Sequence, residues 1–159
     1  MRRIVLWIMV FVFVLSGTLF AYDKELAKRL NMMFSPMTPE VIAKKPCMVN
    51  VKQLLEMIKN KEDFVILDVR TPQEMAVFGI TLKNKLEIPL NELFKEENLN
   101  KLPTDKKIIV VCHTGGRAIP AALGLHLIGF KNVFVLEDGL TELAKQVGRD
   151  TYKYVELQK

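Results

Sequence analysis

Short runs of consecutive apolar residues, each followed by polar residues or glycine, recur in the central and C-terminal parts of the chain. The clearest runs are Phe64–Leu67, Ile108–Val111 and Val133–Leu136, which are rich in β-branched and aromatic side chains. Unbroken apolar runs of this length are typical of strands buried on both faces of a sheet. Shorter segments at Cys47–Val49 and Leu86–Pro89 predict two further strands.

Helix signals lie between these predicted strands. Asn50 and Gln53, like Thr71 and Glu74, have the spacing of a capping box, and Pro72 stands at a first helical position. Two predicted helices start at Val51 and Pro72. Three more are predicted over Asn91–Asn98, Ala118–Leu127 and Leu140–Val147. Strands that alternate with helices predict an α/β fold with a mostly parallel sheet and helices on both faces.

The N-terminal segment has the pattern of a secretory signal peptide. Arg2 and Arg3 precede the unbroken apolar run Ile4–Leu15, and small Ala21 is suited to precede a cleavage site. We therefore predict that residues 1–21 are removed on export and that the protein is periplasmic. The alternative is an uncleaved anchor that holds the protein on the outer face of the cytoplasmic membrane, since the apolar segment approaches the length of a membrane span.

The rest of the chain divides by pattern into three further parts. Residues 22–46 predict an N-terminal helical extension, residues 47–148 a single α/β domain, and residues 149–159 a polar C-terminal tail. Without Arg2 and Arg3, the chain keeps 21 basic against 18 acidic side chains. This balance is too even to indicate a nucleic-acid-binding protein.

The segment 112–118, Cys-His-Thr-Gly-Gly-Arg-Ala, joins a predicted buried strand to a predicted helix. Cys112 is therefore placed at the carboxyl end of a strand and near the amino end of a helix, where backbone N–H groups and the helix dipole favour a thiolate or a bound anion. Gly115 and Gly116 allow the backbone to curl around such a group, and Arg117 adds a fixed positive charge. The alternative is a buried, inert cysteine before an ordinary strand-to-helix turn.

Asp68 and Arg70 follow another predicted strand and are expected at the same edge of the sheet. We interpret them as an ion pair that supports the neighbouring loop, in preference to a direct chemical role. Glu74 is interpreted as a helix cap and not as a catalytic acid.

Four segments together resemble a single-domain rhodanese, over about residues 48–148. They are Phe64–Glu74, with its Asp-Val-Arg sequence, Ile88–Leu90, Val110–Ala118 and Gly129–Val133. The order and spacing of Asp-Val-Arg, the strand-terminal cysteine, the glycine three residues later and the arginine five residues later make the resemblance specific.

The resemblance implies an α/β sandwich and sulfurtransferase chemistry. Cys112 would take sulfane sulfur from thiosulfate or from a persulfide or polysulfide, and would pass it to a thiol or to cyanide. Arg117 would bind an anionic donor. The loop that would hold the persulfide consists of His113, Thr114, Gly115, Gly116 and Arg117. The implied partners are this donor and acceptor, which include a protein persulfide. No metal, organic cofactor or nucleic acid is implied. Membrane contact is expected only if residues 4–20 stay uncleaved.

Two segments depart from the rhodanese pattern. The stretch from Gly79 to Ile88 lacks the usual Gly-His-Ile and Gly-Ala sequences, and Asp138-Gly139 replaces Gly-Gly after the last predicted strand. An acid near the pocket mouth would disfavour small anions such as thiosulfate.

Two other functions stay open. A phosphatase or arsenate reductase on the same fold needs a loop one residue longer than the four residues between Cys112 and Arg117. A non-catalytic binding module of the rhodanese type usually lacks the cysteine. The remaining cysteine, Cys47, is expected to be buried and not to form a disulfide with Cys112.

Overall fold

The computed structural model describes residues 22–155, so the predicted signal peptide, residues 1–21, lies outside the described part of the chain. Backbone contacts divide the chain into the units Met1–Val41 and Ile42–Lys159. In the first unit, helix α2 spans Lys24–Phe34, and its N-cap, Asp23, accepts a hydrogen bond from the Leu26 N–H at 3.0 Å. Within residues 22–155, no helix is both long enough and apolar enough to span a membrane.

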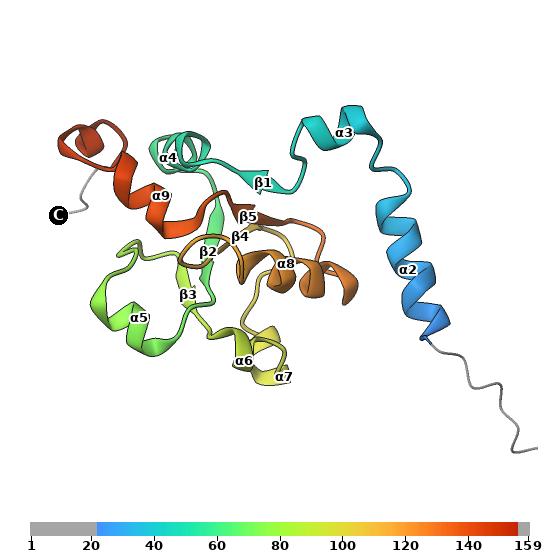
Figure 1. The fold of residues 1–159 in the computed structure, drawn as a ribbon. Helices are drawn as coiled ribbons and strands as arrows, with labels where there is room; N and C mark the ends of the chain where they lie inside the picture. Colours follow the sequence, from blue (N-terminus) through green and yellow to red (C-terminus); the bar gives the residue numbers. More distant parts are fainter. Residues whose placement is uncertain (1–21, 156–159) are drawn as a thin grey trace, which may run out of the picture. The chain divides into compact units, whose positions relative to one another are not determined.

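A sheet of five parallel strands forms the centre of the second unit (Figure 1). The strands are β1 (Met48–Val49), β2 (Phe64–Asp68), β3 (Lys85–Glu87), β4 (Lys107–Val111) and β5 (Val133–Leu136), in the order β1-β5-β4-β2-β3. All five strands lie within two residues of their predicted positions. The predicted parallel α/β fold is therefore confirmed.

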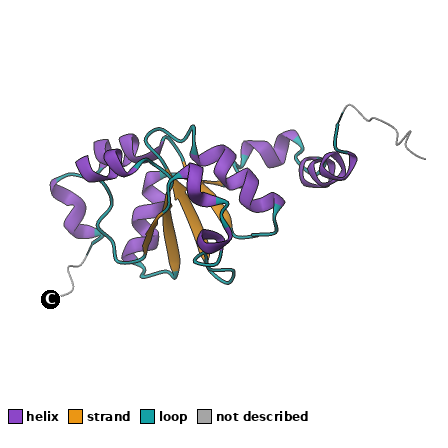
Figure 2. Cartoon of the chain, turned by 90° about the horizontal axis from the view of Figure 1, so that it is seen from below, coloured by secondary structure: helices purple, strands orange, loops and turns teal. Residues whose placement is uncertain are grey.

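Helices cover both faces of this sheet (Figures 1 and 2). The helices of the second unit are α4 (Val51–Lys59), α5 (Pro72–Val77), α6 (Leu90–Leu93), α7 (Glu96–Leu99), α8 (Ala118–Leu127), α9 (Gly139–Gln146) and the 3₁₀ helix η1 (Arg149–Lys153). Helix α3 (Pro39–Ala43) spans the boundary between the two units. Residues of α4 and α9 belong to one hydrophobic cluster, and residues of α6 and α8 belong to the other. The sheet separates these two clusters.

Strand β4 shows how the sequence produces the two clusters. Successive side chains of a strand point to opposite faces of a sheet. Ile108 and Val110 therefore pack in the cluster with α8, and Ile109 and Val111 pack in the cluster with α4 and α9. All four side chains are at most 1% exposed, which explains why this strand is apolar at every one of these positions.

The chain differs from the sequence prediction after β3 and after α9. The single helix predicted over Asn91–Asn98 is replaced by α6 and α7, because Lys95 adopts an extended backbone conformation between them. The N-cap of α6 is Pro89, two residues before Asn91, the predicted start of the helix. The predicted polar tail contains η1, and the half-buried Tyr154 after it packs against the α4 and α9 cluster.

The strand order creates a crevice at the carboxyl ends of β2 and β4. From β2 the chain passes through α5 to β3 on one side, whereas from β4 it passes through α8 to β5 on the other side. The two connections diverge at neighbouring strands, which is where open α/β sheets bind their ligands. The last residue of β2, Asp68, pairs with the last residue of β4, Val111, so the segments that follow them start side by side.

The amino end of α9 contacts the segment that follows β4. The Leu140 N–H donates to the Cys112 carbonyl at 2.9 Å. The N–H and the hydroxyl of Thr141 donate to the His113 carbonyl at 3.0 and 2.9 Å. Gly139 makes this approach possible, because an added Cβ would lie 2.5 Å from the Cys112 carbonyl oxygen and because its φ is +61°.

We predict that Gly139→Ala lowers the free energy of unfolding by about 2 to 4 kcal/mol, since the new methyl group meets rigid backbone atoms at a left-handed position. Urea unfolding followed by circular dichroism measures this loss. Gly148→Ala is the control, because a Cβ at Gly148 has no atom within 4 Å. Equal stability of Gly139→Ala and the wild type would show that α9 does not approach the loop this closely.

Candidate active site

Cys112 directly follows the last residue of β4 and continues the alternation of its side chains between the two faces of the sheet. It lies in the same cluster as Val110 and is 1% exposed. Cys112 thus directly follows the end of a rigid buried strand, next to the residues that follow β2. A nucleophile held in this way loses little conformational freedom when it reacts.

The hydrogen bonds from α9 orient the peptide groups of the loop. In a trans peptide, the carbonyl oxygen and the following N–H point in opposite directions. Because the carbonyls of Cys112 and His113 point at α9, the N–H groups of His113 and Thr114 point away from it. Within residues 22–155, the N–H groups of 113–117 have no hydrogen-bond acceptor, so they are available to an anion in the loop.

The helix after the loop supplies fewer free donors than its position suggests. The N–H of Ile119 is bonded to the Gly115 carbonyl at 3.1 Å, and the N–H of Ala121 to the Arg117 carbonyl at 3.3 Å. Pro120 between them has no N–H. Anion binding at this point therefore depends mainly on the loop itself, with the dipole of α8 as a background contribution.

Of the two glycines in the loop, one has a backbone conformation that favours glycine. Gly115 is buried with a φ of +91°, whereas Gly116 is exposed and its φ is not in the positive range. A Cβ at Gly115 would have its nearest neighbours 3.7 and 3.8 Å away, at Asp138 N and Leu136 O. The curl of the loop therefore depends on Gly115.

Asp68 and Arg70 form a buried ion pair beside the loop. The Arg70 Nη2 donates to Asp68 Oδ2 at 2.7 Å, the Nε donates to both carboxylate oxygens at 3.0 Å, and the backbone N–H of Arg70 donates to Oδ1. Arg70 is 0% exposed and Asp68 is 4% exposed. Neither side chain lines the pocket described below, so the geometry gives the pair a structural function.

Arg70 also holds Phe78, which directly precedes the segment that departs from the rhodanese pattern. Its Nη2 donates to the Phe78 carbonyl at 2.9 Å, and its guanidinium lies 4.9 Å from the centre of the Phe78 ring. The same ring meets the His113 ring edge to face, with centroids 6.2 Å apart. Phe78 thus connects the buried ion pair to the cysteine loop and fixes one side of the site.

Glu74 has two functions in the structure, only one of which the sequence indicates. It completes the capping box of α5, where its Oε2 accepts from the Thr71 N–H at 3.0 Å. In addition, both of its oxygens accept hydrogen bonds from Arg117, each at 2.6 Å. This two-point pairing joins residues that are 43 positions apart, so no local pattern could have revealed it.

The pairing changes the electrostatics of both partners. The pKa of Glu74 is held far below its ordinary value, chiefly by the hydrogen bonds from Arg117 and also by those from Thr71. The pKa of Arg117 is raised, chiefly by Glu74 and to a smaller extent by Cys112. Both groups therefore stay ionised over the physiological range, and Arg117 is close enough to Cys112 to interact with it.

A pocket of about 420 Å³ opens between α5 and the cysteine loop. One wall consists of Glu74, Val77 and Phe78, and the other consists of His113, Thr114 and Arg117. The structure thus brings three of the predicted loop residues to a pocket, whereas neither the buried Cys112 nor Asp138 is among the lining residues. Arg117, which lines the pocket and interacts with Cys112, connects the two. The effect that we expected of Asp138 on small anions therefore has no support from this pocket.

Cys47 is free and half-buried, and it precedes β1 at the amino edge of the sheet. Cys112 follows β4 at the carboxyl edge, two strands away. Strand spacing and register place their Cα atoms roughly 14 Å apart. A disulfide needs Cα atoms within about 7 Å, so this fold does not allow one between them.

The chain is similar to known proteins in sequence and in fold. Residues 50–146 match the family model described as Rhodanese-like domain. The chain is 25% identical over 160 residues to the probable adenylyltransferase/sulfurtransferase MoeZ of Mycobacterium tuberculosis, with 88% of this chain and 40% of that protein covered. It thus spans less than half of that relative's length. A sulfurtransferase of Allochromatium vinosum is 25% identical over 97 residues, with 61% of this chain and 87% of that protein covered.

Among solved structures, a rhodanese-related protein from Thermoplasma volcanium has a TM-score of 0.54 and 31% identity, with 62% of this chain and 91% of that chain covered. The residues matched by the family model run from the N-cap of α4 to the end of α9, include the loop that carries Cys112, and make up more than half of the sequence. The chain belongs to the rhodanese-like domain family.

Proposed function

We propose that this protein is a sulfurtransferase that carries sulfane sulfur as a persulfide on Cys112. Family membership and the sulfurtransferases among its relatives support a role in sulfur transfer. The observation that carries the finer proposal is the orientation of the cysteine loop. The hydrogen bonds from α9 to the Cys112 and His113 carbonyls leave the N–H groups of the loop available to an anionic sulfur.

In the first half of the reaction, the Cys112 thiolate attacks the outer sulfur of the donor. For thiosulfate, the S–S bond of the donor breaks, sulfite leaves with the bonding electron pair, and a new S–S bond forms on Cys112. The outer sulfur of the resulting persulfide carries the negative charge. The loop N–H groups stabilise that charge, as an oxyanion hole stabilises a charged oxygen.

In the second half, an acceptor thiolate attacks the outer sulfur of the persulfide. The S–S bond to Cys112 breaks, and its electron pair returns to Cys112 as the thiolate. Both halves are displacements at sulfur in which donor and acceptor balance the electrons, so the exchange itself requires no electron carrier.

We predict that Cys112→Ser abolishes transfer, because a hydroxyl group does not accept sulfane sulfur. Cys47→Ser is the matched control and should keep most of the activity, since Cys47 lies at the opposite edge of the sheet. After treatment with a donor, intact mass spectrometry should show one added sulfur in the wild type and in Cys47→Ser, and peptide mapping should locate it on Cys112.

Transfer by Cys112→Ser, or sulfur found on Cys47, would contradict this assignment. Hydrolysis of an aryl phosphate, measured on the same samples, tests the phosphatase alternative. Phosphate bound covalently to Cys112, with no persulfide from any donor, would favour the phosphatase.

We also propose that the protein acts outside the cytoplasm, in a periplasm. The support is the sequence pattern of Arg2 and Arg3 before an apolar run. We predict a mature chain that starts at or near Tyr22, and N-terminal sequencing of the extracytoplasmic fraction measures this. A membrane-bound chain that retains Met1 would instead indicate an anchored enzyme on the outer face of the cytoplasmic membrane.

A further inference from the structure

We infer that Glu74 sets the donor preference of the Cys112 site, so that it favours sulfane sulfur on an organic arm with at most one negative charge over the thiosulfate dianion. This inference rests on the proposed function and names the substrate class for the same pocket. It follows from the two-point pairing of Glu74 with Arg117 and from the apolar residues on the wall that carries Glu74.

The positive charge of Arg117 is already neutralised by the Glu74 carboxylate before a donor arrives. Both terminal nitrogens of its guanidinium donate to the Glu74 carboxylate at 2.6 Å. Of the residues that line the pocket, Glu74 and Arg117 are the charged ones, and their charges cancel. A dianion entering the pocket meets no net positive charge and lies close to a carboxylate, which repels it.

The pairing is held in place from the side of Glu74. The same carboxylate accepts from the N–H and the hydroxyl of Thr71, each at 3.0 Å, which anchors it at the start of α5. A rotation of Glu74 away from Arg117 would break these bonds as well. Arg117 is therefore not released easily to bind an anionic donor.

Apolar groups lie beside this neutral pair. Val77 is 84% exposed and Phe78 is 40% exposed, and both line the pocket. Phe78 is fixed by its contacts with Arg70 and His113, so it offers a preformed surface. An organic arm that carries the sulfane sulfur can cover these groups, whereas the oxygen atoms of thiosulfate cannot.

The transfer of sulfur from such a donor to Cys112 balances in atoms and in electrons. With an organic persulfide, R–S–SH, the Cys112 thiolate attacks the outer sulfur, the S–S bond of the donor breaks, and the thiolate R–S⁻ leaves with the electron pair. With an organic thiosulfonate, R–SO₂–S⁻, the leaving group is the sulfinate. Thiosulfonates carry one negative charge, whereas thiosulfate carries two, so they are suitable probes for the effect of charge.

The test compares three donors with the full-length protein: thiosulfate, methanethiosulfonate and benzenethiosulfonate, with cyanide as acceptor. The wild type should have a higher kcat/KM for benzenethiosulfonate than for thiosulfate. Glu74→Gln should raise kcat/KM for thiosulfate about tenfold, because it frees the charge of Arg117. The same variant should change kcat/KM for methanethiosulfonate by about threefold or less. Glutamine keeps an oxygen that can cap α5, so the fold is retained.

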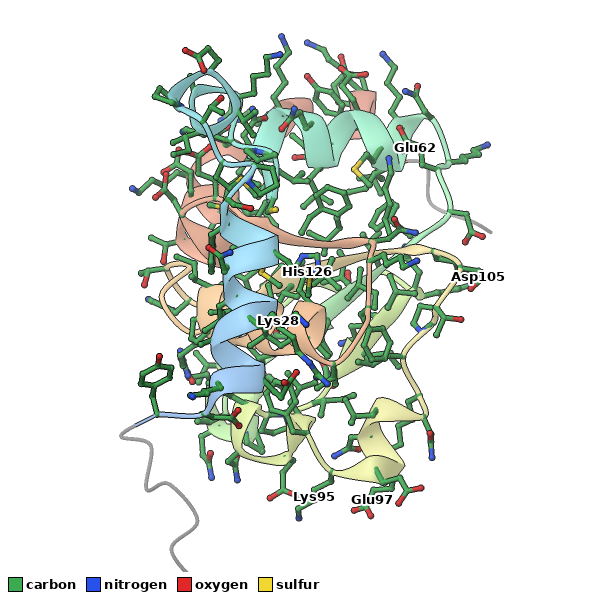
Figure 3. All side chains as sticks on the ribbon, turned by 90° about the vertical axis from the view of Figure 1, so that its right-hand side faces the viewer. Lys28, Glu62, Lys95, Glu97, Asp105 and His126 are labelled. Carbon is green, nitrogen blue, oxygen red and sulfur yellow. The ribbon has the colours of Figure 1, made fainter. Side chains whose placement is uncertain are left out.

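The matched control is Glu62→Gln, which removes the same charge from an ion pair with Lys107 at 2.9 Å. Glu62 lies just beyond the C-terminal end of α4 (Figure 3), and Lys107 starts β4 at the edge of the sheet opposite Cys112. This variant should leave the ratio of kcat/KM for thiosulfate to kcat/KM for methanethiosulfonate unchanged. An equal increase of this ratio in Glu74→Gln and in Glu62→Gln would show an effect of net charge alone and would overturn the inference.

A second pair of variants tests the apolar wall. Val77→Ser should lower the preference for benzenethiosulfonate over methanethiosulfonate about threefold, whereas Ile128→Ser should not change it. Ile128 is 52% exposed at the end of α8 and does not line the pocket. Both positions are on the surface, so both variants should fold.

The outcomes separate the selectivity from the proposed function. If all three donors transfer sulfur, thiosulfate is preferred, and Glu74→Gln leaves kcat/KM for thiosulfate unchanged, the inference about donor selectivity is overturned. The sulfurtransferase proposal then stays intact. The absence of transfer from every donor, in the wild type and in all variants, overturns both proposals.

Discussion

The structure around Cys112 depends on the hydrogen bonds by which the amino end of α9 holds two carbonyl groups of the cysteine loop. These bonds fix the direction of the peptide groups after Cys112. The N–H groups of His113 and Thr114 point away from α9 because the carbonyl groups before them point toward it. The strand order contributes to this, since β5 lies next to β4 and brings α9 to the loop. Gly139 has the conformation and the small size that allow the contact.

The sequence predicts most of the fold because the signals for its elements are local. Apolar runs mark the buried strands, and the pairs Asn50–Gln53 and Thr71–Glu74 form the expected capping boxes. The position of Cys112 between a strand and a helix is also local information. Strand order, by contrast, is not indicated by any of these signals and is seen only in the folded chain.

The main features of the site that the sequence does not reveal depend on contacts between distant segments. The pairing of Glu74 with Arg117 joins α5 to the cysteine loop, and a capping box gives no sign that its carboxylate has a second partner. Likewise, Asp138-Gly139 has the pattern of a turn, but the close approach of Gly139 to the Cys112 carbonyl exists only in the folded chain. The division of one predicted helix into α6 and α7 follows from the backbone at Lys95, which has ordinary helix propensity.

The burial of Cys112 has a consequence for the order of events at the site. With 1% of the residue exposed, the sulfur cannot be approached by two molecules at once. If Cys112 carries sulfur as proposed, the donor product must leave before an acceptor reaches the persulfide, and a fresh donor molecule competes with the acceptor for the same approach. The proposed function then requires a cycle in which the chain alternates between a loaded and an empty form, and in which excess donor obstructs the acceptor.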